Sequence, residues 1–350
     1  MVKWGIVGTG KIAYDVGFAI QSIKACQLVA VSSRNMDNAK KYATRMHIST
    51  FLDDYKTMIA LDIVEVVYIS TPNALHAELI EFALQQGKHV LCEKPMVVQS
   101  AQLEKLKELA AQKQLFLMEA MWTMFMPSVR YLLTHLAQIG SIKMVQGSMG
   151  FVLEKERCFK ENLGGGALLD LGIYLISLTY ALLGQPNHLV AQTSSRKGDV
   201  ETSAGFLLKY DDAVVNLTCS FDVQLDNSFT VYGEKGSLTL KSPFYRSAII
   251  QLEKYSSHTE NVEDIRNDFR SFGPLKSAPA WKQRIYDKLH LGKSQIIIPF
   301  RGNGYQYQIQ EVVDCLRTHR LESAILPIDH SIQVIKIIEK LRNINNEKDD

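Results

Sequence analysis

Three side chains far apart in the sequence could together carry out acid–base chemistry, namely Lys94, Asp170 and Tyr174. Asp170 and Tyr174 are four residues apart in an apolar stretch, so on a helix they share a face. The pKa of a phenol is about 10, which is too high for a base at neutral pH. Because a neighbouring ammonium stabilises the phenolate, Lys94 would lower the pKa of Tyr174. We predict that these two side chains form an acid–base pair.

Each member of this pair also has a structural alternative. Lys94 could be a surface lysine that pairs with Glu93, and Tyr174 could be a core aromatic residue of an apolar helix. Two features of the sequence favour chemistry. Lys94 directly follows a buried-strand pattern and is held by the proline after it. The three glycines at 164–166 are expected to leave room for a ligand.

A glycine-rich motif, Gly-x-Gly-x-x-Ala, occupies residues 8–13. It follows an apolar strand pattern and opens a helix, which is the context of a dinucleotide site. Gly8 would allow the tight turn, and Gly10 would let the backbone approach a diphosphate. The diphosphate would lie on the helix N-terminus beside Lys11 and Ile12.

The end of the second strand pattern discriminates between the two nicotinamide cofactors. An NAD site usually has Asp or Glu there to bond the ribose 2′-hydroxyl. This chain has Ser33 and Arg34 instead, and no carboxylate before Asp37. A guanidinium and a hydroxyl suit a 2′-phosphate, so we expect NADP and regard NAD as less suited. The alternative for Arg34 is a solvated loop arginine.

Polar residues also follow the next two strand patterns, where ligands of open α/β sheets bind. Thr71-Pro72-Asn73 could form a turn in which Asn73 caps a helix, a role compatible with contacting the nicotinamide ribose. His76 could bind the cofactor or be structural. The residues expected at the cofactor site are Gly8, Gly10, Lys11, Ile12, Ser33, Arg34, Thr71, Pro72, Asn73, His76, Glu93 and Lys94.

The composition of the 350 residues is that of a soluble globular protein, with 46% hydrophobic and 22% charged residues. The net charge is +2 and no basic run resembles a nucleic-acid arm, so we expect no nucleic-acid partner. The five cysteines are far apart, which predicts neither disulfides nor a metal site. We find no signal peptide and no apolar run of about 18 residues, so we expect a cytoplasmic protein without a membrane anchor.

Two patterns of elements divide the chain into an expected dinucleotide-binding domain at 1–122, a substrate and dimerisation domain at 123–343, and a polar tail at 344–350. In the first part, apolar strand patterns alternate with helical ones, which predicts a doubly wound parallel sheet. The expected strands are Val2–Val7, Leu28–Ser32, Val64–Ser70, His89–Cys92 and Leu115–Met118, and the expected helices lie near Ile12–Ile20, Met36–Thr44, Ala74–Gln86 and Ser100–Gln112.

In the second part, consecutive strands joined by tight turns predict an open, mainly antiparallel sheet in an α+β domain. The expected strands are Ile142–Phe151, Leu189–Thr193, Ser203–Tyr210, Val214–Phe221 and Phe229–Tyr232, and the expected helices are Ala167–Leu183, Tyr305–Thr318 and Ser331–Arg342. Residues 254–297 have no pattern that we can assign.

Together these motifs resemble the glucose–fructose oxidoreductase/inositol dehydrogenase (Gfo/Idh/MocA) family. The resemblance covers the Gly-x-Gly-x-x-Ala start, Thr-Pro-Asn-x-x-His at 71–76, Glu-Lys-Pro at 93–95 and Gly-Gly-Ala-Leu-x-Asp-x-Gly-x-Tyr at 165–174. It implies a Rossmann domain followed by an open, mainly antiparallel α/β domain whose sheet often forms a homodimer interface.

Tyr174, where inositol dehydrogenase-like members have histidine, is similar to the branch of dimeric dihydrodiol dehydrogenase and NADP-dependent D-xylose dehydrogenase. The resemblance implies that Lys94 and Tyr174 are the catalytic pair, that Trp122 lines the active site and that Arg196 is a substrate-side arginine. Met124 departs from the branch, which usually has arginine there, so a charged contact of the relatives is missing.

The expected reaction is hydride transfer between NADP and a carbinol carbon of an aldose or a trans-dihydrodiol. Tyr174 would take the hydroxyl proton, Lys94 would lower its pKa and hold the substrate oxygen, and Asp170 would bond a neighbouring hydroxyl or orient Lys94. The alternatives are a non-catalytic dinucleotide-binding regulator, an NAD-dependent glycosidase, and an exported oxidoreductase that retains its NADP and passes hydride between two sugars.

Overall fold

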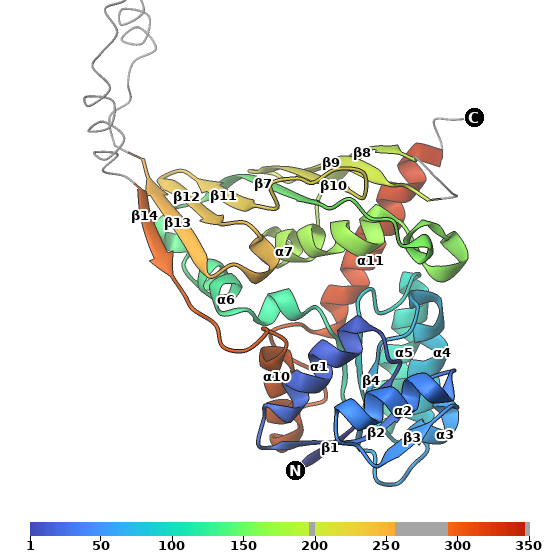
Figure 1. Cartoon of the computed structure of the whole chain (residues 1–350). Coiled ribbons are helices and arrows are strands. Elements are labelled where there is room, and N and C mark those ends of the chain that lie inside the picture. Colours follow the sequence, from blue (N-terminus) through green and yellow to red (C-terminus); the bar gives the residue numbers. More distant parts are fainter. Residues whose placement is uncertain (196–199, 256–292, 347–350) are drawn as a thin grey trace, which may run out of the picture.

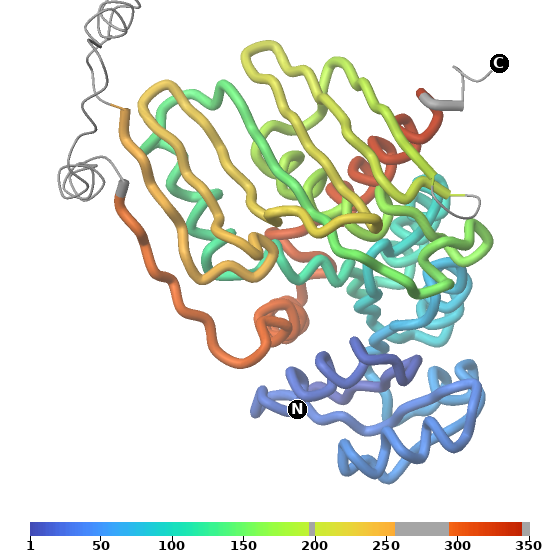
Figure 2. Tube along the Cα trace, turned by 45° about the horizontal axis from the view of Figure 1, so that its top comes forward, coloured from blue at the N-terminus to red at the C-terminus, as the bar shows by residue number. Residues whose placement is uncertain are grey.

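The structure is a computed structural model that describes residues 1–195, 200–255 and 293–346. Two β-sheets form its framework, and each is covered by helices (Figure 1). The tube in Figure 2 shows the first part of the chain on one side of the molecule and the second sheet on the other. The predicted fold class is therefore confirmed: a doubly wound parallel domain followed by a mainly antiparallel one.

The first sheet has six strands in the order β3-β2-β1-β4-β5-β6, and all of its neighbours are parallel. Its strands are β1 (Val2–Val7), β2 (Cys26–Ser32), β3 (Thr50–Leu52), β4 (Val66–Ile69), β5 (His89–Cys92) and β6 (Leu117–Glu119). Sequence patterns missed β3, because three edge residues are too few to show a period. Strands β1 and β4, at the switch in strand order, are the centre of the sheet, and β4 is entirely buried, as parallel strands between two helix layers must be.

Helices connect these strands and cover both faces of the sheet. They are α1 (Lys11–Gln21), α2 (Met36–Arg45), α3 (Tyr55–Ile59), α4 (His76–Gln85), which follows the 3₁₀ turn η1 (Asn73–Leu75), and α5 (Ser100–Lys113). The short α3 was missed. Asn35 and Asp54 cap α2 and α3 by accepting bonds from backbone N–H groups in the first turn.

The second sheet has eight strands in the order β14-β13-β12-β11-β7-β10-β9-β8. They are β7 (Ile142–Gly150), β8 (His188–Ser194), β9 (Ser203–Lys209), β10 (Val214–Ser220), β11 (Phe229–Gly233), β12 (Gly236–Leu240), β13 (Ile249–Lys254) and β14 (Lys293–Ile297). All neighbours are antiparallel except β7 and β10. Three strands at one edge of this sheet, β12, β13 and β14, were not predicted.

The helices of the second part lie mainly between its sheet and the first domain (Figure 1). They are α6 (Pro127–Thr134), which was not predicted, α7 (Ile173–Leu183), α10 (Gln306–Arg317) and α11 (Ile328–Asn346). Short 3₁₀ turns accompany them at η2 (Trp122–Phe125), η3 (Leu136–Gln138), η4 (Glu156–Phe159), η5 (Glu161–Leu163) and η7 (Phe244–Arg246).

The predicted helix Ala167–Leu183 begins with one π-helical turn, η6 (Leu168–Gly172), a feature often found at functional sites. The predicted domain boundary after residue 122 falls at η2, between the two sheets, and stays a prediction.

The segment Glu161–Leu183 is apolar and long enough, by length and composition, to cross a membrane. The expectation that no apolar run reaches such a length is therefore wrong. In the structure, 67% of its apolar window is buried inside the fold, where α7 packs against the sheet and α11 (Figure 1). The apolar character of the segment is thus that of a core helix.

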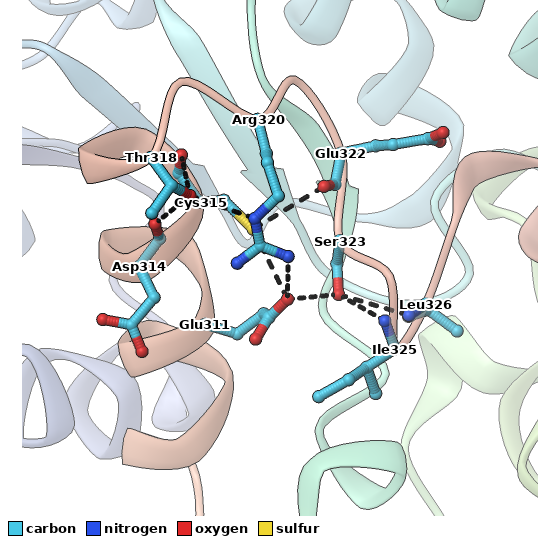
Figure 3. A network of polar contacts seen from close by, with 9 residues as sticks. All are labelled: Glu311, Asp314, Cys315, Thr318, Arg320, Glu322, Ser323, Ile325 and Leu326. Carbon is cyan, nitrogen blue, oxygen red and sulfur yellow. Dashed lines mark hydrogen bonds and ion pairs between the residues drawn. The ribbon is translucent and has the colours of Figure 1, made fainter.

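A polar network joins the end of α10 to the start of α11 (Figure 3). The Glu311 carboxylate accepts a bond from the Ser323 hydroxyl at 2.8 Å and lies 3.7 Å from the Arg320 guanidinium. The Ser323 hydroxyl in turn accepts bonds from the backbone N–H groups of Ile325 and Leu326. These contacts fix the connection from which α11 begins.

Candidate active site

Three contiguous hollows lie where the carboxyl ends of the parallel strands face the second domain. The outer hollow follows the glycine-rich turn and the end of β2, and its lining includes Gly8, Gly10, Lys11, Ser33, Arg34 and Asn38. The inner hollow contains Lys94, Asp170, Tyr174, Glu93, Thr71 and Asn73. The apolar hollow shares the reactive side chains and adds Met149, Phe151, Leu153, Leu171 and Tyr245.

The glycine-rich turn has the geometry that a diphosphate needs. Gly8 adopts a φ of +102°, and a Cβ there would lie 2.8 Å from the Ser70 carbonyl oxygen, so only glycine fits. A Cβ on Gly10 would meet nothing within 4 Å and would project into open space. No side chain caps α1 and no acidic residue lies in its first turn. The first N–H groups of α1 are therefore left for an anion.

The end of β2 presents groups that suit a 2′-phosphate. Ser33 is buried, and its hydroxyl accepts a bond from the Thr9 hydroxyl at 3.1 Å. Arg34 is exposed at the rim, and Asn38 on α2 lines the same hollow. The carboxylate that lines this hollow, Asp15, comes from α1 and not from the end of β2.

The loop after β4 faces both the outer and the inner hollow. Thr71 and Pro72 line both, and the buried Thr71 hydroxyl has no hydrogen-bond partner in the structure. Such an orphaned polar atom fits a ligand that supplies the partner. Asn73 does not cap α4, contrary to expectation: no side chain caps this helix, and the Asn73 amide donates to the Gly164 carbonyl at 2.8 Å.

His76 is completely buried and lines none of the three hollows. Its ring nitrogens lie 2.9 Å from the carbonyl oxygens of Thr71 and Pro95. Burial lowers the pKa of His76. The geometry therefore favours the structural alternative, in which the imidazole ties the loop after β4 to the turn that carries Lys94.

Lys94 and Asp170 meet in the inner hollow, although 76 residues separate them. The Lys94 ammonium donates to the Asp170 carboxylate and to the Asp170 backbone carbonyl, both at 2.6 Å. It also lies 4.7 Å from the centre of the Tyr174 ring. Lys94 is thus neither a surface lysine nor the partner of Glu93, because only 11% of its side chain is exposed and Asp170 takes the ion pair.

The Tyr174 hydroxyl accepts a hydrogen bond from the Trp122 indole N–H at 3.3 Å. Trp122 packs in turn against Tyr305, with ring centres 4.5 Å apart. Both aromatic residues line the inner and the apolar hollow. The hydroxyl is therefore held by the indole donor, while the Lys94 ammonium lies over the ring.

The pKa of Tyr174 differs from the sequence expectation. Burial raises it, and although Lys94 acts to lower it as expected, the net pKa lies above the ordinary value. The expectation of a pKa nearer neutrality is thus wrong for this structure, because desolvation of the phenolate outweighs one ammonium. For Asp170, burial opposes ionisation but Lys94 outweighs it, so the pKa is lowered. For Lys94, burial is likewise outweighed by Asp170 and Tyr174, and the pKa is raised.

Glu93 lies beside Lys94 on the inner hollow and is buried. Burial raises the pKa of its carboxyl to about 7, although a hydrogen bond from the Tyr68 hydroxyl opposes this. The carboxyl therefore changes charge near neutral pH.

The three glycines at 164–166 are required by close packing, although Gly164 and Gly165 also line the inner hollow, as expected of residues beside a ligand. A Cβ on Gly164 would lie 2.7 Å from the Val98 side chain, and one on Gly165 would lie 2.6 Å from the Cys158 carbonyl oxygen. Gly166 has a φ of +115°, and its Cβ would overlap the Arg342 guanidinium and the Glu201 carboxylate. Close contacts with neighbouring atoms of the same chain explain why glycine stands at all three positions.

Sequence patterns missed several residues of the cleft. Arg157, in η4, lines all three hollows, Lys155 lines the outer and the apolar one, and Tyr305 lines all three. One sequence signal could have identified Lys155 and Arg157: two basic residues stand two positions apart, a few residues before the glycines at 164–166. No local signal marks the apolar wall, because its residues come from β7, η6 and the loops after β7 and β12.

Two other expectations concern the substrate side. Arg196 lies outside the described residues. Met124 is buried, with 1% exposed, and lines none of the three hollows. Within the described ranges, no group of three or more His, Cys, Asp or Glu could hold a metal ion, and all five cysteines are buried and free.

Comparison with known proteins covers almost the whole chain. Residues 2–121 match a family model described as an oxidoreductase family with an NAD-binding Rossmann fold, and residues 135–239 match the GFO/IDH/MocA C-terminal domain. The chain is 31% identical to human trans-1,2-dihydrobenzene-1,2-diol dehydrogenase and 28% identical to that of Xenopus tropicalis, in each case covering 97% of this chain and 96% of the relative.

Solved structures share the fold at lower identity. KijD10, a 3-ketoreductase from Actinomadura kijaniata in complex with NADP and TDP-benzene, has a TM-score of 0.81 and 23% identity, covering 98% of this chain and 97% of that one. The aldose-aldose oxidoreductase from Caulobacter crescentus, complexed with glycerol, has a TM-score of 0.81 and 22% identity, covering 99% and 98%.

Proposed function

Because the chain belongs to the Gfo/Idh/MocA oxidoreductase family, we propose that it is an NADP-dependent dehydrogenase acting on a carbinol carbon of an aldose or a trans-dihydrodiol. Its relatives are dehydrogenases and reductases of diols and sugars, and the N-terminal domain is an NAD(P)-binding Rossmann domain. The observation that carries the proposal is the meeting of Lys94, Asp170 and Tyr174 in a cleft that continues to the glycine-rich turn.

The residues of the outer hollow fit NADP. The N-terminus of α1 at Gly10 would hold the diphosphate, Ser33 and Arg34 would hold the 2′-phosphate, and the Thr71 hydroxyl would gain a partner. Arg157 adds a positive charge from the second domain. When bound, NADP supplies or accepts the hydride.

The protein itself moves the proton at the Tyr174 hydroxyl. In the oxidation direction, the phenol first releases its proton to solvent, and the phenolate oxygen then takes the proton of the substrate hydroxyl, while the Lys94 ammonium holds the substrate oxygen and favours the phenolate. Asp170 positions that ammonium through its two 2.6 Å contacts. Since burial raises the pKa of Tyr174, the neutral phenol is the resting form and is ready to donate its proton in the reduction direction.

The apolar hollow is the proposed substrate site. Aromatic side chains of Trp122, Phe151 and Tyr245 surround the reactive groups. Aromatic faces suit the C–H face of a sugar ring or the ring of a cyclic diol. The diol class is supported by the names of the relatives at about 30% identity, and the aldose class by the Caulobacter crescentus neighbour.

Two other functions use the same scaffold. A dinucleotide-binding regulator has no need of a lysine and a tyrosine in one cleft, and this chain keeps both. An NAD-dependent glycosidase is less suited to the Ser33–Arg34 rim. We further propose that the protein is a homodimer through the open face of the eight-stranded sheet, and a cytoplasmic location stays a prediction.

The experiment that tests the proposal has two steps. The shift of the thermal unfolding midpoint with NADP and with NAD first identifies the better cofactor, which we expect to be NADP. A panel of D-xylose, D-glucose, trans-cyclohexane-1,2-diol and trans-1,2-dihydrobenzene-1,2-diol is then screened for steady reduction of that cofactor. Continuous turnover with a member of the panel excludes a pure regulator and a glycosidase that retains its cofactor. A protein that binds NADP but reduces none with any member contradicts the proposal.

A further inference from the structure

The last helix, α11, contacts both halves of the active site without reaching the cleft itself. It packs against α5 and β6 in the first domain and against α7 and β8 in the second. Figure 1 shows it running from the first domain to the second sheet. Eleven residues, or about three turns, separate the two residues of α11 that make these contacts, the buried Ser331 and the half-buried Arg342.

The first contact fixes the turn that carries Lys94. The Ser331 hydroxyl donates to one oxygen of the Glu119 carboxylate at 2.7 Å, and the other oxygen accepts the backbone N–H of Met96 at 2.9 Å. Glu119 is 1% exposed. Met96 lies two residues after Lys94, so this carboxylate connects α11 to the backbone of the Lys94 turn.

The second contact fixes the start of the helix that carries Asp170 and Tyr174. The Arg342 guanidinium donates to the Gly165 carbonyl at 2.7 Å and to the Glu201 carboxylate at 2.8 Å. The same Glu201 oxygen accepts the backbone N–H of Leu168 at 3.1 Å, at the first residue of the π-helical turn. Glu201 therefore satisfies a free N–H at the helix start, where a carboxylate is stabilising.

The fit around this second contact is close. A Cβ on Gly166 would overlap both charged groups, and the Glu201 backbone carbonyl accepts the Ala167 N–H at 2.9 Å. His330, next to Ser331, adds a bond between its ring and the Ser177 hydroxyl of α7 at 2.8 Å. The helix with Tyr174 is thus held to α11 at its start and near its middle.

We propose that α11 sets the spacing between Lys94 and Tyr174 through two carboxylates, so that Glu119 and Glu201 are positioning residues of the reaction. Lys94 and Tyr174 come from different domains, and proton transfer between well-placed groups is sensitive to displacements of about 1 Å. A helix with one polar contact to each domain, buried at Ser331 and half-buried at Arg342, limits that displacement. This inference rests on the proposed function, since it takes Lys94 and Tyr174 as the reacting pair.

The test compares Ser331→Ala, Arg342→Lys and Arg342→Met with the unchanged enzyme, using the panel substrate of highest kcat/KM. Lysine cannot donate to Gly165 and Glu201 with the geometry of a guanidinium. We expect kcat to fall about 10- to 100-fold in Arg342→Met and less in the two milder variants. We expect NADP affinity to stay within about twofold, because the cofactor is held chiefly by the first domain. The primary deuterium isotope effect on kcat should rise, as hydride transfer becomes slower than cofactor release.

Lys336→Met is the matched control, because Lys336 forms an ion pair from the same helix to Glu104 of α5 at 2.6 Å, on the exposed side. It should leave kcat and the isotope effect unchanged. Normal kcat in all three test variants, with Tyr174→Phe inactive, overturns the inference and leaves the proposed function standing. An active Tyr174→Phe enzyme overturns the proposed function itself. If Arg342→Met does not fold, Ser331→Ala and Arg342→Lys test the inference by the same criteria. A loss of kcat that is matched by an equal loss of NADP affinity also overturns the inference.

Discussion

Two opposing effects act on the pKa of the Tyr174 hydroxyl. Removal from water raises its pKa, while the Lys94 ammonium and the Trp122 N–H stabilise the phenolate and lower it. In this structure burial has the larger effect, so ionisation at neutral pH is limited. At the scale of single residues, the reaction therefore depends on how far Lys94 compensates for burial.

Replacing Tyr174 with phenylalanine tests this balance. The variant keeps the ring over Lys94 but loses the hydroxyl, so we expect kcat to fall about 10²–10⁴-fold with unchanged NADP affinity. In the unchanged enzyme, oxidation should become faster as pH rises through the neutral range, because the raised pKa of Tyr174 lies above this range and the phenolate fraction therefore grows with pH. The variant should keep only the dependence that comes from Glu93, whose pKa is about 7. The measurement is kcat against pH for both enzymes.

Tyr180→Phe is the control for this experiment, since Tyr180 lies on the same helix, packs against His330 and lines none of the three hollows. Wild-type turnover in Tyr174→Phe, with an isotope effect showing that hydride transfer limits the rate, would mean that another group moves the proton.

Arg34 sets the expected preference for NADP. Arg34→Ala should weaken NADP binding about 10- to 100-fold, since a charge-assisted bond to phosphate contributes about 1.5–3 kcal/mol. NAD has no 2′-phosphate, so its affinity should hardly change. Calorimetric titration of both cofactors measures the difference. Arg45→Ala is the control, because Arg45, at the end of α2, packs over Tyr14 and Phe18 and does not line the outer hollow. Equal losses for the two cofactors would place Arg34 away from the 2′-phosphate.

At the scale of elements, the contact between α7 and α11 holds the helix that carries Tyr174. His330 of α11 is buried against α7, with its ring bonded to Ser177 and edge-on to Tyr180 at 4.9 Å between ring centres. Burial lowers the pKa of His330 to about 4. The imidazole is therefore neutral in the folded protein near pH 7.

This contact makes stability depend on pH in a defined window. In the unfolded chain the His330 pKa returns to about 6.5, so the unfolded state binds a proton that the folded state does not. The free energy of unfolding should then fall as pH drops from about 6.5 to about 4, by up to about 3 kcal/mol at 1.4 kcal/mol per pKa unit. Urea unfolding near pH 7 and near pH 5 measures the fall, which His330→Gln should reduce. An equal fall in both proteins would show that other groups cause it.

At the scale of the whole molecule, the eight-stranded sheet has one face covered by helices and one face without a described helix (Figure 1). Val190, Leu207 and Val214 lie on the open face and are 53%, 46% and 45% exposed. Val190 and Leu207 are direct neighbours across β8 and β9. Apolar side chains adjoining on an open sheet face favour contact with a second copy of the chain.

Sedimentation velocity tests the proposed homodimer. We expect the unchanged protein to sediment as a dimer and Leu207→Lys to sediment as a monomer, because a buried ammonium at a two-fold interface would meet its own copy or lie unpaired. Ile63→Lys is the control, since Ile63 is 43% exposed and lies outside the second domain's sheet. A monomeric unchanged protein would exclude the dimer.

The sequence by itself determined the Rossmann half and the glycine-rich turn, and it singled out the side chains that we propose as the reactive ones. Gly8 needs a positive φ and Gly10 an open approach, and both demands are local, so the motif predicted them. The strands of the parallel sheet were predicted because burial on both faces makes them continuously apolar. The edge strand β3 and strands β12–β14 were missed, since short or partly exposed strands depend on their neighbours for pairing.

Only the tertiary structure decided how these residues act on each other. It paired Lys94 with Asp170 and not with Glu93, bonded Asn73 to Gly164, and filled the space beside Gly166 with Arg342 and Glu201. It also raised the pKa of Tyr174, where charge alone predicted a decrease. The physical reason is that burial and long-range contacts are properties of packed surroundings. Side chains 76 or 177 residues apart meet only when the chain is folded, so no local pattern encodes their distances.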